Sequence, residues 1–274
     1  MDLSGSTFNG HHASLASTTK QAAIWLSNAQ IGGKLLCVGT KIYAAGHRAI
    51  HADGIRVAGT VRLIEGFAAS GQVRLLGAEF SGSLDLTGIH LDEPIDGLAL
   101  DLGDARIAGG LFVVPAPDGS TPRIQGQLDM GGARIGGQCL FRAVRVHANP
   151  VSPPRPGFPS RRVYGSAISA PRVVVANDIT FEGDCQIEGG IDLSLCEVSD
   201  IWIDGTTRLL SPSAIALDLS SAQLLGTLKL KSGCEVQGRM NLTSARIGGR
   251  LGLTGTIWSE PLRGLAVNAP SLVL

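Results

Sequence analysis

The sequence predicts an all-β protein: a single-stranded parallel β-helix (solenoid), which we expect to be right-handed, with nine to ten coils of 23–28 residues. Three observations predict this fold. One motif recurs along the whole chain with a period in the twenties. Apolar residues alternate with other residues inside each copy, as in Leu100-Asp101-Leu102, which is strand periodicity. The 37 glycines, with only 4% aromatic residues, indicate many turns between short strands.

The motif aligns at its first apolar residue in ten copies. Two of them, ALDLGDARIAGGLFV from Ala99 and RMNLTSARIGGRLGL from Arg239, show its form. A second strand follows the glycines, so two or three short strands make one coil. The ten aligned residues are Ile24, Ile50, Val73, Leu100, Leu128, Ile168, Ile191, Leu217, Met240 and Leu265.

Other positions of the motif also form columns. A small residue stands five positions after the first apolar residue and an inward apolar residue two positions further on, as in Ala105 and Ile107. We expect the five cysteines to be small buried residues of these columns. Because Gly and Asn tolerate positive φ, we expect a left-handed turn along one glycine column. That column contains Gly33, Gly59, Gly82, Gly109, Gly137, Gly226 and Gly249, with Asn177 replacing glycine once.

Five-residue steps relate this chain to a known kind of solenoid. Leu102 and Ile107 lie five residues apart, and Ala105-Arg106-Ile107 looks like one such step. In this the chain resembles the pentapeptide-repeat proteins and related actinobacterial β-solenoids, and more distantly the polymer-forming bactofilins. The resemblance covers nearly the whole chain and implies a bacterial right-handed β-helix. The register departs from the strict pattern, because the second strand follows the inward apolar residue by four residues instead of five.

We divide the chain into an N-terminal part-coil, residues 1–23, and a β-helix, residues 24–274. The stretch SLASTTKQAAIWL suggests a short helix that caps the first coil. Connectors of variable length lead from each second strand to the next copy, and they hold eleven of the 13 prolines. Because proline cannot donate to a strand ladder, we interpret the connectors as loops. The longest is a Pro/Arg-rich insertion at 142–165.

Three groups of residues are candidates for function. Insertions on solenoids often lie on the binding face, so the first group lies in the long connector: Arg155, Phe158, Arg161, Arg162 and Tyr164. The second group is Phe112, Leu140 and Trp202, which occupy the outward middle position of the second strand. Either the long connector covers them or they contact another chain. The third group is an acidic face on the first strand, formed by Asp101, Asp129, Asp192 and Asp218.

The acidic face has two interpretations. Stacked aspartates beside arginines predict a solvated lattice of weak ion pairs. The alternative is a calcium or sugar site built on the carboxylates.

Composition and motifs argue against several functions. Lys plus Arg and Asp plus Glu are both 23, whereas nucleic-acid binders usually carry a basic surplus. The chain has no HExxH, GxSxG, P-loop or GxGxxG motif, so we predict no catalytic residue, metal ligand or cofactor. It also lacks a secretory signal and any apolar run of membrane-spanning length. With an odd number of cysteines, this predicts a cytoplasmic location. Peripheral association with a membrane stays open.

We therefore expect a non-catalytic scaffold or protein-interaction module. Its partner is another protein or a second copy, bound through the ends of the solenoid or through an apolar strand face. The alternative is an enzyme or a glycan- or anion-binding β-helix that uses the acidic face and the Arg-rich connector.

Overall fold

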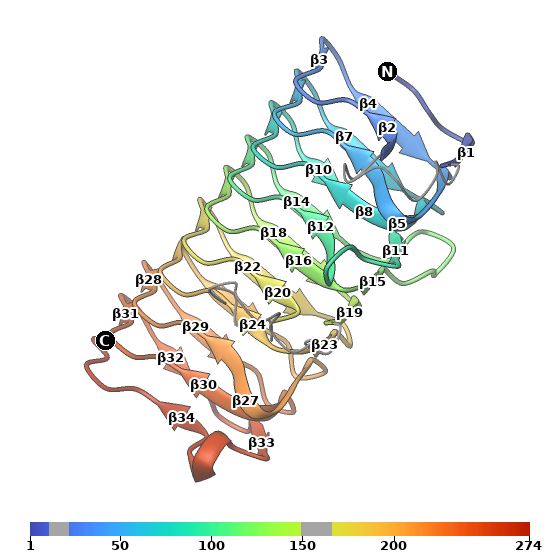
Figure 1. Cartoon of the computed structure of the whole chain (residues 1–274). Coiled ribbons are helices and arrows are strands. Elements are labelled where there is room, and N and C mark those ends of the chain that lie inside the picture. The colour runs from blue at the N-terminus through green and yellow to red at the C-terminus, as the bar shows by residue number, and fades with distance from the viewer. Residues whose placement is uncertain (11–21, 149–165) are drawn as a thin grey trace, which may run out of the picture.

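The computed structural model describes residues 1–10, 22–148 and 166–274, which form a parallel β-solenoid of about nine turns. Figure 1 shows the coils stacked one on another from the N-terminal to the C-terminal end. Successive coils pair through parallel strands, for example Leu111 with Cys139 and Phe112 with Leu140. The described residues contain no α-helix, and their single helical element is a 3-10 turn, η1 (Leu262–Gly264). The predicted fold class is confirmed.

Two of the three sheets have nine strands each, one strand per coil. Sheet C follows the first turn of each coil: β3 (Gln30–Ile31), β6 (Arg56–Val57), β9 (Glu79–Phe80), β13 (Arg106–Ile107), β17 (Arg134–Ile135), β21 (Val174–Val175), β25 (Glu197–Val198), β28 (Gln223–Leu224) and β31 (Arg246–Ile247). Sheet A comes next: β4 (Leu35–Val38), β7 (Val61–Ile64), β10 (Leu84–Asp85), β14 (Leu111–Val113), β18 (Cys139–Arg142), β22 (Ile179–Glu182), β26 (Ile201–Ile203), β29 (Leu228–Leu230) and β32 (Leu251–Gly252).

Sheet B has 16 strands because it contains two stacks side by side. One stack holds the first strand of each coil: β2 (Ala22–Trp25), β12 (Leu98–Asp101), β16 (Gln127–Asp129), β20 (Ile168–Ser169), β24 (Ile191–Asp192) and β34 (Val267–Asn268). The other holds connector strands: β1 (Thr7–Asn9), β11 (His90–Asp92), β15 (Arg123–Gln125), β19 (Arg145–His147), β23 (Gln186–Glu188) and β33 (Ile257–Ser259). Four long strands pass through both stacks: β5 (Lys41–His51), β8 (Ala68–Arg74), β27 (Arg208–Asp218) and β30 (Glu235–Asn241).

The interpretation of the connectors as loops is therefore wrong in part. Each coil has one more strand than the motif indicates, and this strand lies inside the connector. Its inward residues, such as Leu91, Ile124 and Val146, are buried in the common core. A three-residue strand with one inward side chain gives too short an alternation to stand out in a sequence of variable spacing.

The structure confirms nine of the ten aligned first-strand positions. Ile24 pairs with Ile50, and the chain of partners continues without a slip to Leu217 and Met240. The tenth is wrong, because Met240 pairs with Val267 and not with Leu265, which is exposed. The turn η1 and its flanking residues lengthen the last connector by two residues, so the first apolar residue after it is not the one that pairs.

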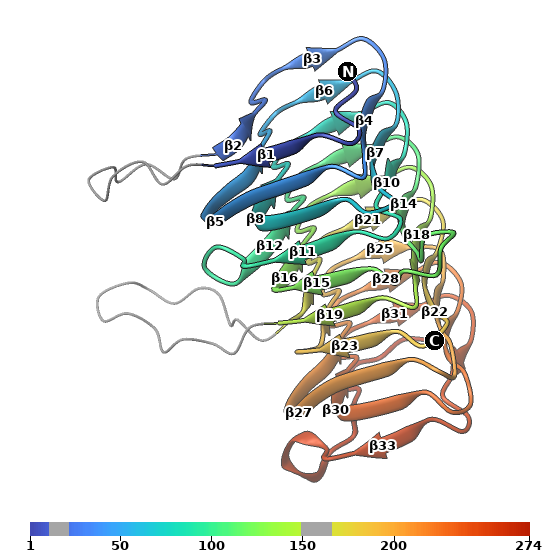
Figure 2. The ribbon, with the colours of Figure 1, turned by 90° about the vertical axis from the view of Figure 1, so that its right-hand side faces the viewer.

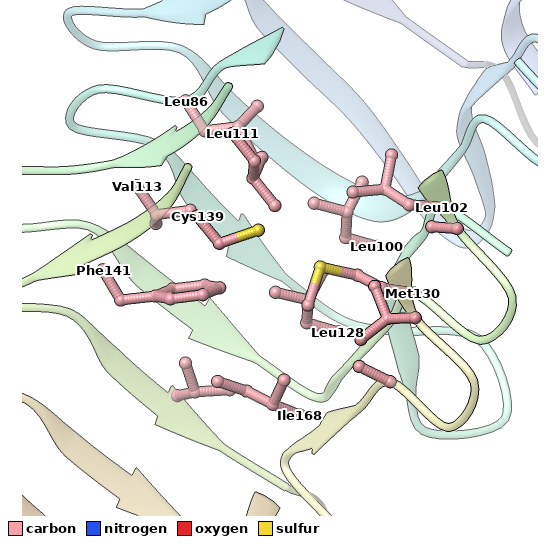
Figure 3. Packing of buried hydrophobic residues seen from close by; sticks show 14 of the residues in the cluster. Leu86, Leu100, Leu102, Leu111, Val113, Leu128, Met130, Cys139, Phe141 and Ile168 are labelled. Atoms are coloured by element: carbon pink, nitrogen blue, oxygen red, sulfur yellow. The ribbon is translucent and has the colours of Figure 1, made fainter. Parts of the chain in front are cut away.

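The core is one continuous ladder of aliphatic side chains inside the coils. Figure 3 shows Leu100, Leu128 and Ile168 lying over one another, with Cys139 and Phe141 opposite them. The rings of Phe141 and Phe181 stack with centroids 4.8 Å apart, which is the spacing of paired strands. As predicted, all five cysteines are free and buried in this core.

The predicted left-handed turn in the glycine column is wrong. No residue of that column has positive φ. A different column, five positions earlier and in the turn after the first strand, has positive φ throughout. Asp104 and Ser221 adopt φ of 53° and 55° there, and only three of the ten residues at this position are glycines. This left-handed position contains Asn28, Gly54, Gly77, Asp104, Gly132, Arg172, Leu195, Ser221, Ser244 and Ser271.

Close approach between coils explains the glycine column instead. A Cβ added at Gly137 would lie 2.8 Å from the backbone nitrogen of Gly110 in the preceding coil. At Gly82 the nearest atom, the Thr60 nitrogen, is 2.7 Å away. Gly33 belongs to the first coil of the ladder, and a Cβ there meets nothing within 4 Å. Close approach to the preceding coil, and not φ, therefore explains Gly82 and Gly137, while Asn177 shows that the column accepts a side chain in another coil.

Insertions occur at two corners of the coil. Residues 114–122 lie between β14 and β15, and other insertions lie at the corner where the connector strand meets the first strand of the next coil. The 93–97 loop and η1 both lie at this corner and project from the same edge in Figure 2. Where no insertion occurs, a glycine closes the corner: Gly71, Gly126, Gly189 and Gly238 have φ of 112–119°. Most of the predicted capping helix falls outside the described residues, and its last part, Ala22–Trp25, is strand β2.

The glycine column gives a direct test of coil stacking. Gly137→Ala should lower the free energy of unfolding by about 1–3 kcal/mol, since the new methyl group overpacks the contact with Gly110. Gly33→Ala, the matched change in the first coil, should shift it by less than about 0.5 kcal/mol. Urea unfolding followed by circular dichroism measures both. Equal losses in the two variants would contradict the stacking explanation.

Candidate functional site

The predicted acidic face exists as a stack of side chains on sheet B. Asp101 pairs in register with Asp129, and Asp192 with Asp218. Ser169 separates the two pairs, and Asn241 follows Asp218. Of the four aspartates only Asp101 is buried, while the others are half-buried.

Each of these carboxylates holds the turn that follows its own strand. Oδ1 of Asp129 accepts a hydrogen bond from the Gly131 N–H at 2.9 Å, and Asp192 and Asp218 do the same with Ser194 and Ser220. These turns contain the left-handed residues, so the aspartate satisfies a backbone donor where the strand ladder stops. A structural role is thereby established for the column. A cation or sugar site on it stays a prediction.

At the N-terminal end of the column the side chains form a charged cluster. Nε of Arg74 donates to both carboxylate oxygens of Asp53 at 2.9 Å, and its Nη1 lies 3.6 Å from Oδ2 of Asp101. His51 lies 3.7 Å from Asp53 and stacks on the exposed Trp25, with ring centroids 4.2 Å apart. Burial lowers the pKa of His51. His51 and Arg74 belong to the same outward column as the aspartates, and Asp53 reaches them from the turn that follows His51.

Burial also raises the pKa of Asp101, against the opposing effects of the Gly103 N–H bond and the Arg74 guanidinium. Ionisation of the Asp101 carboxyl in the folded protein therefore costs free energy.

The three apolar candidates lie on the outer side of sheet A. Phe112 pairs in register with Leu140, Leu140 with Thr180, and Thr180 with Trp202, so four successive strands carry them. All four side chains are half-buried. The Phe112 ring lies over Gly110, where a Cβ would come within 2.8 Å of its Cζ. The ammonium group of Lys229 lies over the Trp202 ring, 5.8 Å from the ring centroid. We call Phe112, Leu140, Thr180 and Trp202 the apolar strip.

Sheet C has a shallow groove that the sequence analysis did not identify. Its volume is about 510 Å³, and several small residues line it, among them Ala108, Gly136 and Ala176. Charged side chains border it, where Glu79 pairs with Arg56 at 3.1 Å and with Arg106 at 3.6 Å. The sequence feature that corresponds to this groove is a small residue directly after each inward apolar residue, as Ala108 follows Ile107. Small residues are common at solenoid corners, so this signal alone does not indicate a groove.

The candidate residues Arg155, Phe158, Arg161, Arg162 and Tyr164 lie outside the described residues. The described chain leaves the coil after β19 at Ala148 and returns at Ser166 just before β20. Both positions flank strands of sheet B, whereas the apolar strip belongs to sheet A. Cover of the strip by this connector stays a prediction.

No group of three or more His, Cys, Asp or Glu side chains within the described part of the chain is arranged to hold a metal ion. No helix within residues 1–10, 22–148 or 166–274 is long and apolar enough to cross a membrane. Burial raises the pKa of the Cys37, Cys196 and Cys234 thiols to about 12.

Comparison of the chain with protein-family models, with curated proteins and with solved structures gives no match. The β-solenoid fold stands on the structure itself, and no family identifies which kind of solenoid it is.

Replacement of Asp101 tests the cost of its buried charge. The pKa of Asp101 in the folded state lies above the unfolded value, so the folded protein binds this proton more tightly. The contribution of Asp101 to stability therefore falls as the pH rises from its unfolded pKa, about 4, through its higher folded pKa. Asp101→Asn removes this dependence and keeps an acceptor for the Gly103 N–H, as Asn241 does for Thr243.

Urea unfolding of both proteins between pH 4 and pH 7 measures the difference. The free energy of unfolding of Asp101→Asn, relative to the unsubstituted protein, should increase with pH over this range. Asp101→Ala also removes the turn hydrogen bond, and it should show the same trend at a lower stability. A difference that stays constant or decreases with pH would contradict the account.

Proposed function

We propose that this protein is a non-catalytic β-solenoid scaffold that binds protein through the outer side of sheet A, with a second copy of the chain as the first partner. The observation that carries the proposal is the apolar strip. Four neighbouring strands place Phe112, Leu140, Thr180 and Trp202 in one line on an outward face.

The strip differs from the other outward columns in its chemistry. The sheet C column carries charged pairs such as Arg56 with Glu79, and the sheet B column carries aspartates that bind their own turns. On the strip, two aromatic rings and a leucine stand where the side chain points away from the core. Aromatic residues set among polar neighbours are typical of protein interfaces, where their burial supplies most of the binding energy.

Association through the ends of the stack is the second mode within the same proposal. In the described coil nearest the C-terminal end, β32, β33 and β34 each pair on one side only. Four apolar side chains are exposed there: Ile257, Leu265, Val273 and Leu274. A parallel edge of this kind accepts further strands in the same direction. Contact through ends is heterologous and grows into longer assemblies, whereas contact through a face can close at two copies.

The finer assignments are part of the same proposal. The pentapeptide-repeat-like kind of solenoid is supported by pairs such as Leu102 and Ile107, which are five residues apart and both buried. Five free, buried cysteines agree with a reducing compartment such as the cytoplasm. The alternative function, an enzyme or a glycan- or anion-binding protein, depends on connector residues outside the described ranges and stays a prediction.

The strip is tested by its removal. Sedimentation or light scattering of the unsubstituted protein should show an average mass that rises toward two chains with concentration. Phe112→Ser with Leu140→Ser should raise the dissociation constant at least about tenfold, since the strip then loses its apolar anchors. Leu225→Ser is the matched control, because Leu225 is the most exposed leucine among those described and lies beside the sheet C groove.

The control variant should keep the concentration dependence of the unsubstituted protein. A one-chain mass at every concentration, or an equal effect of both substitutions, would contradict the proposal.

A further inference from the structure

We infer that the second copy binds the apolar strip about a two-fold axis that runs along the strands, between β18 and β22. This inference rests on the proposed function and adds which residues face each other. It comes from the order of the outward residues along sheet A.

That order is fixed by the strand register. From the N-terminal side, the middle position reads Arg62, Asp85, Phe112, Leu140, Thr180, Trp202, Lys229 and Gly252. An acidic residue therefore precedes the apolar strip, and a basic residue follows it. Within one chain Asp85 already pairs with Arg62 at 3.2 Å, and Lys229 lies over the Trp202 ring, so the contact between copies would add a second partner to each charge. Asp85 lies two coils before Leu140, and Lys229 lies two coils after Thr180, so the two charges are equally far from the centre of the strip.

A two-fold axis along the strands reverses this order in the second copy. Phe112 then faces the partner's Trp202, and Leu140 faces the partner's Thr180. At both ends of the strip, Asp85 faces the partner's Lys229. The apolar strip is thus self-complementary, and each end carries one ion pair between the copies. Opposed charges at the rim fix the register of an interface more than they strengthen it.

The neighbouring outward column agrees with this axis. Arg142 on β18 and Glu182 on β22 already form an ion pair within one chain, with Nε of Arg142 2.7 Å from Oε1 of Glu182. The axis passes between them, so Arg142 also faces the partner's Glu182. The two pairs then form a square of alternating charges at the centre of the contact.

Other placements of the axis are less favourable. If the axis passes through Leu140, Arg62 faces the partner's Lys229. Leu36 precedes Arg62 in the same outward column. If the axis passes between Phe112 and Leu140, Asp85 faces the partner's Thr180 and Lys229 faces the partner's Leu36, so neither charge meets an opposite charge across the interface. An axis parallel to the solenoid puts every residue opposite itself, and Asp85 then faces the partner's Asp85. Like charges opposed across an interface cost several kcal/mol.

The size of the face sets the expected affinity. Nine strands at about 4.8 Å spacing give a face on the order of 40 Å long, and each strand is only two to four residues wide. This lies at the small end of specific interfaces, so the dimer should be weak and depend on concentration.

Charge reversal at the rim tests the register. Lys229→Glu places a second acidic group opposite the partner's Asp85 and should raise the dissociation constant at least about tenfold. Arg246→Glu makes the same change of charge on sheet C, where Arg246 is exposed, and should leave the constant unchanged. Adding Asp85→Asn to Lys229→Glu removes the repulsion and should recover most of the affinity. The asparagine can still accept the Thr87 N–H, as Asn241 does for Thr243.

Cross-linking tests the symmetry directly. The native thiols are buried and unreactive, so cysteines introduced on the surface react selectively. Asp85→Cys with Lys229→Cys should give a covalent dimer with a short bismaleimide, because the two positions face each other only between copies. Each single substitution should stay at the mass of one chain.

The outcomes separate this inference from the proposed function. Efficient cross-linking of a single variant would overturn the inferred axis. If the double variant does not cross-link while Phe112→Ser with Leu140→Ser still lowers the mass, the strip binds a second copy in another arrangement and the inference fails. If the unsubstituted protein never exceeds the mass of one chain, both fail.

Discussion

The in-register stacking of coils is the constraint on which the rest of the structure depends. Each strand pairs with its equivalent in the next coil, so every side chain lies over residues of the same motif position. Inside the solenoid this makes continuous aliphatic columns and the Phe141–Phe181 stack. At the turn it leaves no room for a Cβ at Gly109 or Gly137, whose nearest neighbours are backbone and side-chain atoms of the preceding coil. On the outside it lines up charges and rings that one isolated strand could not bring together.

Translation along the stack also explains which parts of the fold the sequence could predict. A column repeats its residue type because each coil gives that position the same surroundings, so Leu100, Leu128 and Ile168 were aligned correctly from sequence. The strand in the connector was missed because variable spacing hides a repeat of three residues. The φ values were assigned to the wrong glycines, since sequence alone does not distinguish a glycine required by φ from one required by close approach. In the left-handed turn, Asp104, Leu195 and Ser221 show that residues other than glycine are accepted there.

For the candidate site, the sequence predicted which residues stack on one another but not which contacts their side chains make. The sequence indicated that Asp101 stacks on Asp129 and Phe112 on Leu140, and both pairs are in register. It could not indicate that Asp101 is buried and bound by Arg74, because that depends on Asp53 reaching across from a neighbouring turn. The order Asp85, apolar strip, Lys229 was also present in the sequence. Its self-complementarity follows only once the register is known.

The central claim is that one coil is an interchangeable unit held by contacts with its two neighbours. Deletion of residues 217–239 removes one whole coil and joins Ala216 to Met240, which restores the pairing with Ile191. Far-UV circular dichroism with thermal unfolding should show a cooperative β structure for this variant. Deletion of residues 217–228 joins Ala216 to Lys229, puts a sheet A strand where a sheet B strand is required, and should abolish cooperative unfolding. Loss of structure in the whole-coil deletion, or equal tolerance of both deletions, would contradict the account.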